Sequence, residues 1–142
     1  MSADAPYVSL VLACYDEAEH LEASVAEILD TLSPAGWTFE VVFVDDCSRD
    51  RTPSILREIV AANPDRDLRL VRHEANRGRG ATVSDGFRAA RGEICGYLDV
   101  DLEVHPRYVP SLVREIEKGA DVATVQRIYA FQPRSLDRYF MS

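Results

Sequence analysis

The sequence predicts an α/β domain with a mostly parallel sheet and helices on both of its faces. Short apolar runs alternate along the chain with longer segments whose apolar residues recur at helical spacing. The apolar runs are continuous Val, Ile and Leu stretches, which is typical of strands that are covered on both faces. The chain has 142 residues, so one domain spanning residues 1–142 is expected.

The first apolar run, Tyr7–Ala13, predicts a buried strand. A helix is expected over Glu17–Thr31, because Leu21, Val25 and Ile28 recur at the spacing of one helix face. Proline and glycine then end this segment. The order of strand and helix begins the alternating pattern that implies right-handed crossovers between parallel strands.

Two more pairs of strand and helix follow. Phe39–Val44 is a second buried run, and Thr52–Ala62 is an amphipathic segment with Pro53 suited to its first turn. Leu68–Val71 predicts a short third strand, and Gly80–Ala90 predicts a third helix. All three strands are expected to lie in the same sheet.

The last third of the chain repeats the pattern once more. Ile94–Leu98 predicts a fourth strand and Pro106–Lys118 a fourth helix, with Gly119 as its stop. A fifth strand is expected at Val122–Val125. Residues 126–142 show no clear period and are expected to form an irregular tail.

Composition excludes several classes of protein. There are 16 basic and 24 acidic side chains, a net charge of −8, which argues against nonspecific nucleic-acid binding. No apolar run approaches the ~20 residues of a membrane span, and the first residues do not resemble a secretory signal. Three scattered cysteines predict neither a disulfide framework nor a shared metal, so a cytoplasmic chain is expected.

Acidic side chains follow three of the predicted strands. These residues are Asp16, Glu17, Asp45, Asp46, Asp99, Asp101 and Glu103. Because the carboxyl ends of parallel strands meet at one edge of a sheet, we expect these carboxylates to crowd together and to raise one another's pKa. Such a cluster is costly unless a cation or ligand donors compensate its charge.

Two of these carboxylates suggest a metal site. Asp99 and Asp101 would face the same way in an extended segment, where they could hold Mg²⁺ or Mn²⁺ beside a phosphate. The alternative is that they are solvated or cap the next helix. Similarly, Asp45 and Asp46 suggest an exposed carboxylate for a ribose hydroxyl or a base N–H, whereas Asp50 is expected to cap the following helix.

The loop Asn76–Gly80 allows two interpretations. Its glycines and arginines could cradle a phosphate, or they could form a tight turn with solvated arginines. The histidines His20, His73 and His105 are interpreted as surface, loop and helix-start residues. The three cysteines are interpreted as small buried thiols, and no nucleophilic triad is suggested.

Four segments carry a family resemblance: VLACYDEAEHL, VFVDDCSRDRT, NRGRGATVSDGFRAARGE and YLDVDLEVHP. In this order, they resemble the nucleotide-binding half of family-2 glycosyltransferases with the GT-A fold, which has a Rossmann-like sheet. The resemblance is strongest to the dolichol-phosphate mannosyltransferase and polyprenyl-phosphate glycosyltransferase branch. Relatives of this kind continue beyond the matching region into a part that binds the acceptor, which this chain is expected to lack.

The resemblance also implies roles for individual residues. Catalytic roles fall on Asp99, Asp101 and Arg127, and metal binding falls on Asp99 and Asp101, with Glu103 as a further ligand. Nucleotide-sugar contacts fall on Ala13, Tyr15, Glu17, Val44, Asp46, Asp99, Val100, Asp101 and Arg127. The chain departs from the family pattern at Ala13, where relatives have proline, and at Asp16, where they have asparagine.

The implied activity is metal-dependent, inverting transfer of a hexose from a GDP- or UDP-sugar to a polyprenyl phosphate. This implies Mg²⁺ or Mn²⁺ as cofactor and an acceptor at the inner face of the membrane. The alternatives are a non-catalytic nucleotide-sugar-binding fragment and a transferase with a saccharide acceptor. A nucleotidyltransferase fits less well, because it requires a glycine-rich basic loop after the first strand. Self-association through an uncovered sheet edge is compatible with the sequence.

Overall fold

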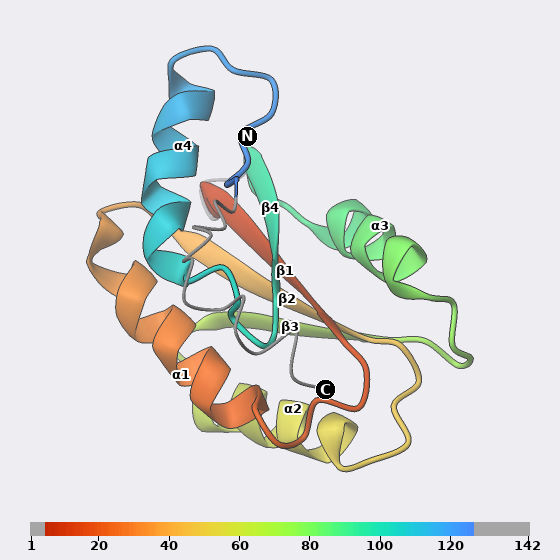
Figure 1. Ribbon diagram of the computed structural model, residues 1–142. Helices are drawn as coiled ribbons and strands as arrows, with labels where there is room; N and C mark the ends of the chain where they lie inside the picture. The colour runs from red at the N-terminus through yellow and green to blue at the C-terminus, as the bar shows by residue number, and fades with distance from the viewer. Residues whose placement is uncertain (1–4, 127–142) are drawn as a thin grey trace, which may run out of the picture.

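The computed structural model describes residues 5–126, which form an α/β domain (Figure 1). Its four strands are β1 (Val8–Cys14), β2 (Phe39–Asp45), β3 (Asp67–Arg72) and β4 (Ile94–Asp99). Its helices are α1 (Leu21–Leu32), α2 (Thr52–Ala62), α3 (Arg79–Ala89) and α4 (Val109–Glu117), with short 3₁₀ helices at Ser33–Ala35 and Pro106–Tyr108. The strand order is β3-β2-β1-β4, and every neighbouring pair is parallel, which confirms the predicted fold class.

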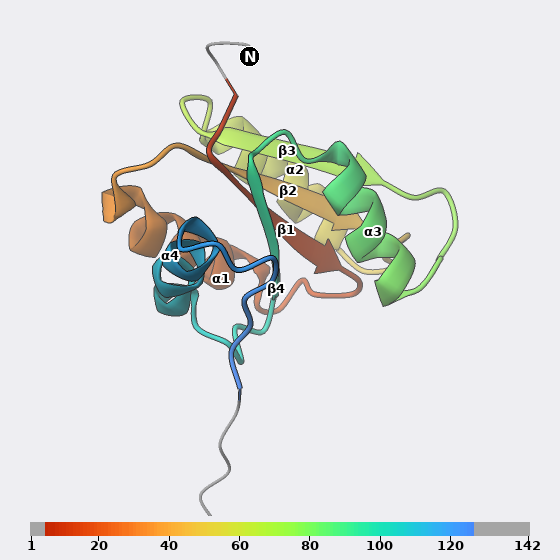
Figure 2. The ribbon, with the colours of Figure 1, turned by 90° about the horizontal axis from the view of Figure 1, so that it is seen from above.

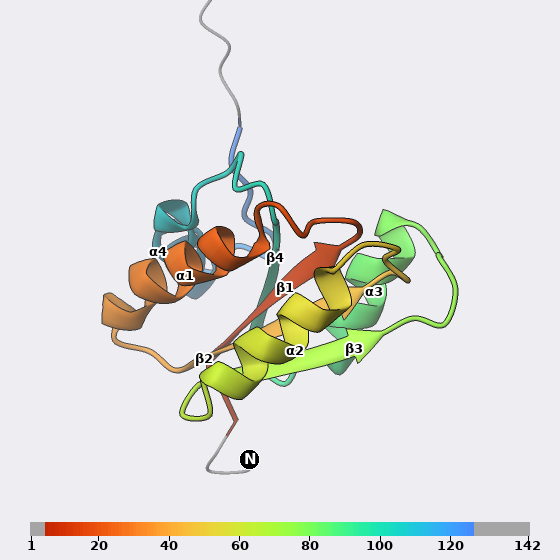
Figure 3. The ribbon, with the colours of Figure 1, turned by 90° about the horizontal axis from the view of Figure 1, so that it is seen from below.

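The helices are divided unequally between the two faces of the sheet. Helices α1, α2 and α4 cover one face, and α3 alone lies on the other (Figures 1 and 2). The view from below shows α1 and α2 on the same side of the strands, away from α3 (Figure 3). Alternate residues of β1 therefore belong to different cores: Leu10 and Leu12 belong to the large cluster, and Val11 to a small one.

The core beneath α3 is thin. It consists of Val11, Val42 and Val44, with two partly buried neighbours from β3 and α3. Helix α3 can approach closely because Gly86 faces Val11, where a Cβ atom would lie only 2.3 Å from Val11 Cγ1. Little apolar area is thus available on this face, and polar contacts must contribute to holding the helix.

A buried ion-pair network lies at the C-terminal end of α3. Glu40 on β2 is fully buried and accepts a hydrogen bond from Ser9 Oγ at 2.6 Å. Its carboxylate also accepts from Arg69 Nη1 at 3.1 Å and from Arg91 Nη2 at 3.0 Å, and Arg91 in turn pairs with Asp67. Burial raises the pKa of Glu40, but these hydrogen bonds outweigh it and the net pKa is lowered. The network fastens the segment after α3 to three strands.

The helices and strands of the structure agree with the predicted ones, with three corrections. The fifth strand at Val122–Val125 is wrong: these residues form no strand, and Val122 is 82% exposed. Three apolar residues and one threonine are too few to predict pairing by themselves. The first helix begins at Leu21 rather than Glu17, and Pro106–Lys118 begins as a 3₁₀ turn before α4, which ends at Glu117. The tail prediction falls almost wholly outside residues 5–126.

No helix in the described part of the chain is long and apolar enough to span a membrane.

Strand β4 lies at one edge of the sheet and is only partly covered. Tyr97 on this strand is 50% exposed, and its ring makes an edge contact with Phe87 of α3.

Candidate functional site

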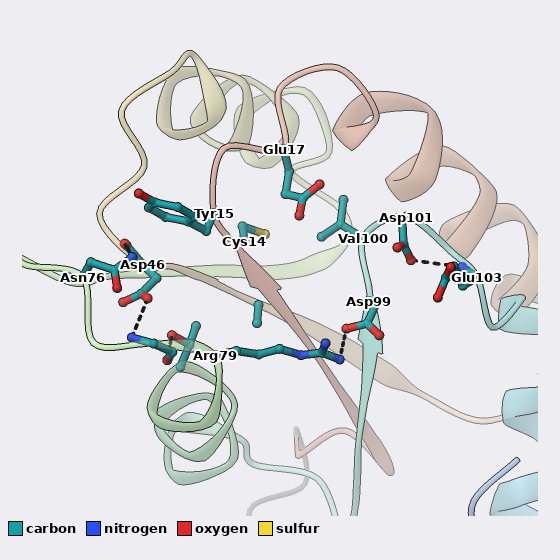
Figure 4. Close-up of a pocket in the computed structure, with 13 residues that line it drawn as sticks. Cys14, Tyr15, Glu17, Asp46, Asn76, Arg79, Asp99, Val100, Asp101 and Glu103 are labelled. Atoms are coloured by element: carbon teal, nitrogen blue, oxygen red, sulfur yellow. Dashed lines mark hydrogen bonds and ion pairs between the residues drawn. The ribbon is translucent and has the colours of Figure 1, made fainter. Parts of the chain in front are cut away.

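A cavity of about 450 Å³ opens at the carboxyl edge of the sheet (Figure 4). Eight predicted site residues line it: Ala13, Tyr15, Glu17, Asp46, Asp99, Val100, Asp101 and Glu103. Five further lining residues are Cys14, Asn76, Gly78, Arg79 and Thr82. The segments that follow β1, β2, β3 and β4 therefore converge on one hollow, as expected for a parallel sheet.

One predicted site residue in the described part of the chain is not part of the cavity. Val44 is fully buried in the small core cluster and does not line the hollow. Arg127 lies outside the described residues, so its assignment stays a prediction. Asp16 and Asp45, from the acidic cluster, also do not line the cavity.

Asp46 is a buried carboxylate fixed by the loop that follows β3. Its Oδ1 accepts from the backbone N–H of Arg77 at 2.8 Å, and its Oδ2 accepts from that of Gly78 at 2.9 Å. His73 Nδ1 lies 2.7 Å from the same Oδ1. Burial raises the pKa of Asp46, but the hydrogen bonds from His73, Arg77 and Gly78 prevail and leave it lowered.

The expectation of an exposed carboxylate at Asp45 and Asp46 is wrong. Asp45 is fully buried and pairs with Arg72 Nε at 3.3 Å, while Asp46 is 3% exposed. The cause is the position of both residues at the end of the central strand β2, under the loop after β3. Asp46 nevertheless lines the cavity, and its carboxylate is directed at the loop after β3 (Figure 4).

His73 is a buried bridge rather than an ordinary loop residue. Its Nδ1 contacts Asp46, and its Nε2 lies 3.1 Å from Asp85 Oδ2 on α3. Asp85 also pairs with Arg77 and Arg88. The middle of α3 is thus tied to the end of β2 through a chain of charged groups.

These contacts predict a specific pH dependence of stability. Because the pKa of Asp46 is lower in the folded chain than in the unfolded chain, its carboxylate stabilises the fold above the unfolded pKa of about 3.9. That contribution is lost as the pH falls through the folded pKa. We expect Asp46→Asn to lower the free energy of unfolding at pH 7 and to differ less from the wild type near pH 3, measured by urea denaturation. Asp30→Asn, on the exposed face of α1, is the control, and a pH-independent difference for Asp46→Asn would contradict the assignment.

The loops after β1 and β2 are locked together. Asp16 Oδ1 accepts from the backbone N–H of Arg49 at 2.7 Å, and its Oδ2 accepts from Arg49 Nη2 at 3.0 Å. The hydrogen bond from the Arg49 N–H is the main reason that the pKa of Asp16 is lowered. Arg49 also lies over the ring of Tyr15, 5.6 Å from its centroid. Asp16, which differs from the asparagine expected from the family resemblance, thus helps to hold the Tyr15 ring at the cavity through Arg49.

Backbone geometry sets this edge of the sheet apart. In the described part of the chain, three residues other than glycine have positive φ: Asp16 at 52°, Cys47 at 60° and Leu102 at 52°. Each follows a strand at the carboxyl edge, where unusual backbone conformations often accompany functional sites. Leu102 tolerates this conformation because its side chain packs against the large core.

The predicted metal ligands lie after β4. Asp99 ends the strand, and the buried side chain of Val100 anchors the turn that follows. Asp101 Oδ1 accepts from the backbone N–H of Glu103 at 3.1 Å. Burial raises the pKa of Glu17 across the cavity, and the charges of Asp101, Asp50 and Asp99 raise it further. The cavity is therefore a place where negative charge is crowded.

The donor set suits a hard divalent cation. Among residues 5–126, no three His, Cys, Asp or Glu side chains are grouped closely enough to hold a metal by themselves. Mg²⁺ normally binds through one or two carboxylates and completes its shell with waters and phosphate oxygens. Asp99 and Asp101, with Glu103 on the same wall, fit that arrangement. Asp99 is engaged by Arg79 in this conformation.

The loop Asn76–Gly80, for which the sequence allowed two interpretations, contributes residues to the cavity. Arg79, at the start of α3, extends across the cavity to Asp99 (Figure 4). Arg77 pairs with Asp85, so neither arginine is simply solvated. The glycine-rich spacing was a signal for this loop, but only the fold shows which arginine enters the cavity.

The remaining candidate residues have local roles. Asp50 accepts from the backbone N–H of Thr52 at 2.8 Å, as expected at the start of α2. His105 likewise accepts from Arg107 N at 3.1 Å at the start of the 3₁₀ helix Pro106–Tyr108. Of the cysteines, only Cys14 is buried, and Cys95 is exposed, so the prediction of three buried thiols is wrong. Burial raises the pKa of the Cys14 thiol well above its usual range.

Comparison with known proteins finds a family model and several relatives that match this chain. The model of the family described as "Glycosyl transferase family 2" matches residues 9–141. A dolichol-phosphate mannosyltransferase from Pyrococcus furiosus is 32% identical over 84% of this chain and 33% of its own length. An undecaprenyl-phosphate 4-deoxy-4-formamido-L-arabinose transferase from Shewanella sediminis is 38% identical over 85% and 37%. The succinoglycan biosynthesis protein ExoO of Rhizobium meliloti is 42% identical over 83% and 32%.

A solved structure gives the same picture. A mannosyltransferase from Pyrobaculum calidifontis, in complex with GDP-Man and Mn²⁺, superposes with a TM-score of 0.68 at 31% identity. The match covers 79% of this chain and 32% of that protein. The chain thus spans about a third of the length of the relatives it matches.

Proposed function

Because the chain belongs to glycosyl transferase family 2, we propose that it forms the donor-binding part of a metal-dependent, inverting glycosyltransferase. The donor is a GDP- or UDP-hexose, and the acceptor is a polyprenyl phosphate. The observation that carries the proposal is the convergence of Tyr15, Asp46, Asp99 and Asp101 on one cavity. Its volume of about 450 Å³ lies in the range of small-molecule sites.

The two sides of the cavity suit the two ends of a nucleotide sugar. On one side, Tyr15 offers an aromatic face and Asp46 offers a buried carboxylate, which suit a base and a ribose. On the other side, Asp99 and Asp101 would hold Mg²⁺ or Mn²⁺ beside the diphosphate. When bound, this cation neutralises negative charge on the leaving nucleoside diphosphate. The protein itself contributes position and fixed charges.

Charge balance supports the assignment of a cation. A chain of net charge −8, with Glu17, Asp46, Asp99, Asp101 and Glu103 around one cavity, repels a free diphosphate. A divalent cation removes that repulsion. The solved mannosyltransferase relative contains GDP-Man and Mn²⁺ together, which supports the same arrangement here.

The names of two relatives support the acceptor, since they act on dolichol phosphate and undecaprenyl phosphate. Such an acceptor is already an anion, so it can attack the sugar carbon without a protein base. We place the reaction at the inner face of the membrane, with this part of the protein peripheral to it. The similarity to a succinoglycan biosynthesis protein favours a saccharide acceptor as the second candidate.

The test is calorimetric titration of the chain with GDP and with UDP, in Mn²⁺, in Mg²⁺ and in EDTA. We expect one nucleotide to bind and to require the cation. Equal binding in EDTA would contradict the metal assignment, and no binding of either nucleotide would contradict the donor site. Trp37 is a poor fluorescent reporter, because it lines a different hollow at the opposite end of the sheet.

Transfer is tested separately on the full-length protein that contains these residues. A radiolabelled sugar is supplied as the matching nucleotide sugar, with either a lipid extract or a saccharide mixture as acceptor. Label in the lipid phase supports the polyprenyl phosphate, whereas label in the saccharide supports the second candidate. Binding without label in either phase supports a non-catalytic donor-binding role.

A further inference from the structure

Within residues 5–126, Arg79 is the one basic side chain that lines the cavity. Its Nη2 forms an ion pair with Asp99 Oδ1, and its guanidinium lies 6.0 Å from the centroid of the Tyr97 ring. The side chain runs across the hollow from the start of α3 to the end of β4 (Figure 4). It thereby places a positive charge on one of the two carboxylates assigned to the cation.

We propose that Arg79 is an internal counter-ion that exchanges partners when the donor binds. Without a metal, it neutralises Asp99. When the cation and the nucleotide diphosphate bind, Arg79 leaves Asp99 and pairs with the diphosphate. This inference rests on the proposed function, because it assumes that Asp99 holds the cation and that the diphosphate lies beside it.

The electrostatics of the cavity require such an exchange. A guanidinium and a divalent cation repel each other, so both cannot pair fully with the same Asp99 oxygen. The diphosphate brings new negative charge, and Arg pairs strongly with phosphate oxygens. The movement is inexpensive because the Arg79 side chain is 61% exposed, and exposed ion pairs contribute little.

The consequence is a coupling between the two ligands. Metal binding alone must displace Arg79 from Asp99, whereas metal binding with nucleotide gives Arg79 a new partner. Each ligand should therefore strengthen the binding of the other. Arg79 would suppress occupation of the site by a cation alone and favour the complete complex.

The test compares the wild type with Arg79→Met, Arg79→Lys and Arg77→Met. Mn²⁺ affinity is measured without nucleotide, and the affinity for the preferred nucleotide diphosphate is measured in saturating Mn²⁺. For Arg79→Met, we expect Mn²⁺ alone to bind about two- to fivefold more tightly, as for removal of an exposed pair. We expect the nucleotide to bind about tenfold more weakly, because a charged hydrogen bond to phosphate is lost.

The controls separate this exchange from a general effect of charge. Arg79→Lys keeps the charge and should stay near the wild type. Arg77→Met removes the same charge from the same loop, but Arg77 pairs with Asp85, so it should not tighten Mn²⁺ binding. The inference is overturned if Arg79→Met leaves the affinity for Mn²⁺ alone unchanged, or if the two affinities of Arg79→Met equal those of Arg77→Met. It is also overturned if Arg79→Met binds both Mn²⁺ and the nucleotide more weakly than the wild type. If the wild type binds no nucleotide, the proposed function fails. The measurement with Mn²⁺ alone still tests whether the Arg79–Asp99 pair opposes cation binding.

Discussion

Asp101→Ala is expected to abolish the metal-dependent part of nucleotide binding. Asp101 lines the cavity, and its charge already contributes to raising the pKa of Glu17 across it. Loss of an outer partner of a metal site typically weakens binding by about 10–100-fold, so loss of a direct ligand should exceed about 100-fold. The measurement is calorimetric titration with the preferred nucleotide in Mn²⁺ and in EDTA.

Two variants sharpen this prediction. Asp101→Asn keeps an oxygen that can accept the hydrogen bond from Glu103 N, so the turn is retained while the charge is lost. It should weaken binding nearly as much as Asp101→Ala if charge is what the site requires. Asp65→Ala removes an acidic side chain at the opposite end of the sheet and should bind like the wild type. Metal-dependent binding by Asp101→Ala at wild-type strength would remove Asp101 from the metal site.

Glu40→Ala is expected to lower the free energy of unfolding by about 2–4 kcal/mol. Breaking a buried ion pair typically costs about 3–5 kcal/mol, because a buried charge is left without a partner. Here the cost should be somewhat smaller, since the Arg69 and Arg91 side chains are 36% and 46% exposed and can be hydrated. The measurement is urea denaturation at pH 7.

Glu40→Gln should lose less than Glu40→Ala. The amide oxygen can still accept from one of the groups that the carboxylate serves, such as Ser9 Oγ or Arg91 N. Glu58→Ala is the matched control, because Glu58 is exposed on α2 and its loss should change the free energy by no more than about 0.5 kcal/mol. A loss for Glu40→Ala that equals this control would show that the network contributes nothing to stability.

The strands were predictable because each carries a short run rich in apolar residues, although only β1 and β2 are buried along nearly their whole length. The four strands of the structure begin and end within two residues of the predicted ranges. Because the strands are parallel, their carboxyl ends lie at the same edge of the sheet, as predicted. The failed strand at Val122–Val125 is only four residues long and includes a threonine, and none of its residues is buried in the structure. Apolar character indicates that a segment can be buried, whereas pairing depends on what lies beside it.

The candidate site was predictable as a set of loops but not as a set of contacts. Five of the seven acids at the carboxyl ends of β1, β2 and β4 line the cavity, since sheet topology brings those loops together, whereas Asp16 and Asp45 do not. The expectation that these acids raise one another's pKa holds for Glu17, in addition to its burial, but it is wrong for Asp16 and Asp46, whose pKa values are lowered by hydrogen bonds. The roles of His73 and Arg79 could not be predicted, because the loop after β3 takes its shape from hydrogen bonds to Asp46. Glu40 escaped notice for a similar reason: two of its partners, Arg69 and Arg91, lie 29 and 51 positions away.

The unequal cover of the sheet has a consequence for how the domain comes apart. Helix α3 has a thin apolar core, with Gly86 against Val11, and charged contacts at Asp85 in its middle and at Arg91 just beyond its C-terminal end. Helices α1, α2 and α4 rest on the much larger apolar cluster. Guanidinium chloride is a salt and screens charges, whereas urea is neutral, so the two denaturants act differently on the two faces. We therefore expect the detachment of α3 from the sheet to depend more strongly on ionic strength than the unfolding of the main core does.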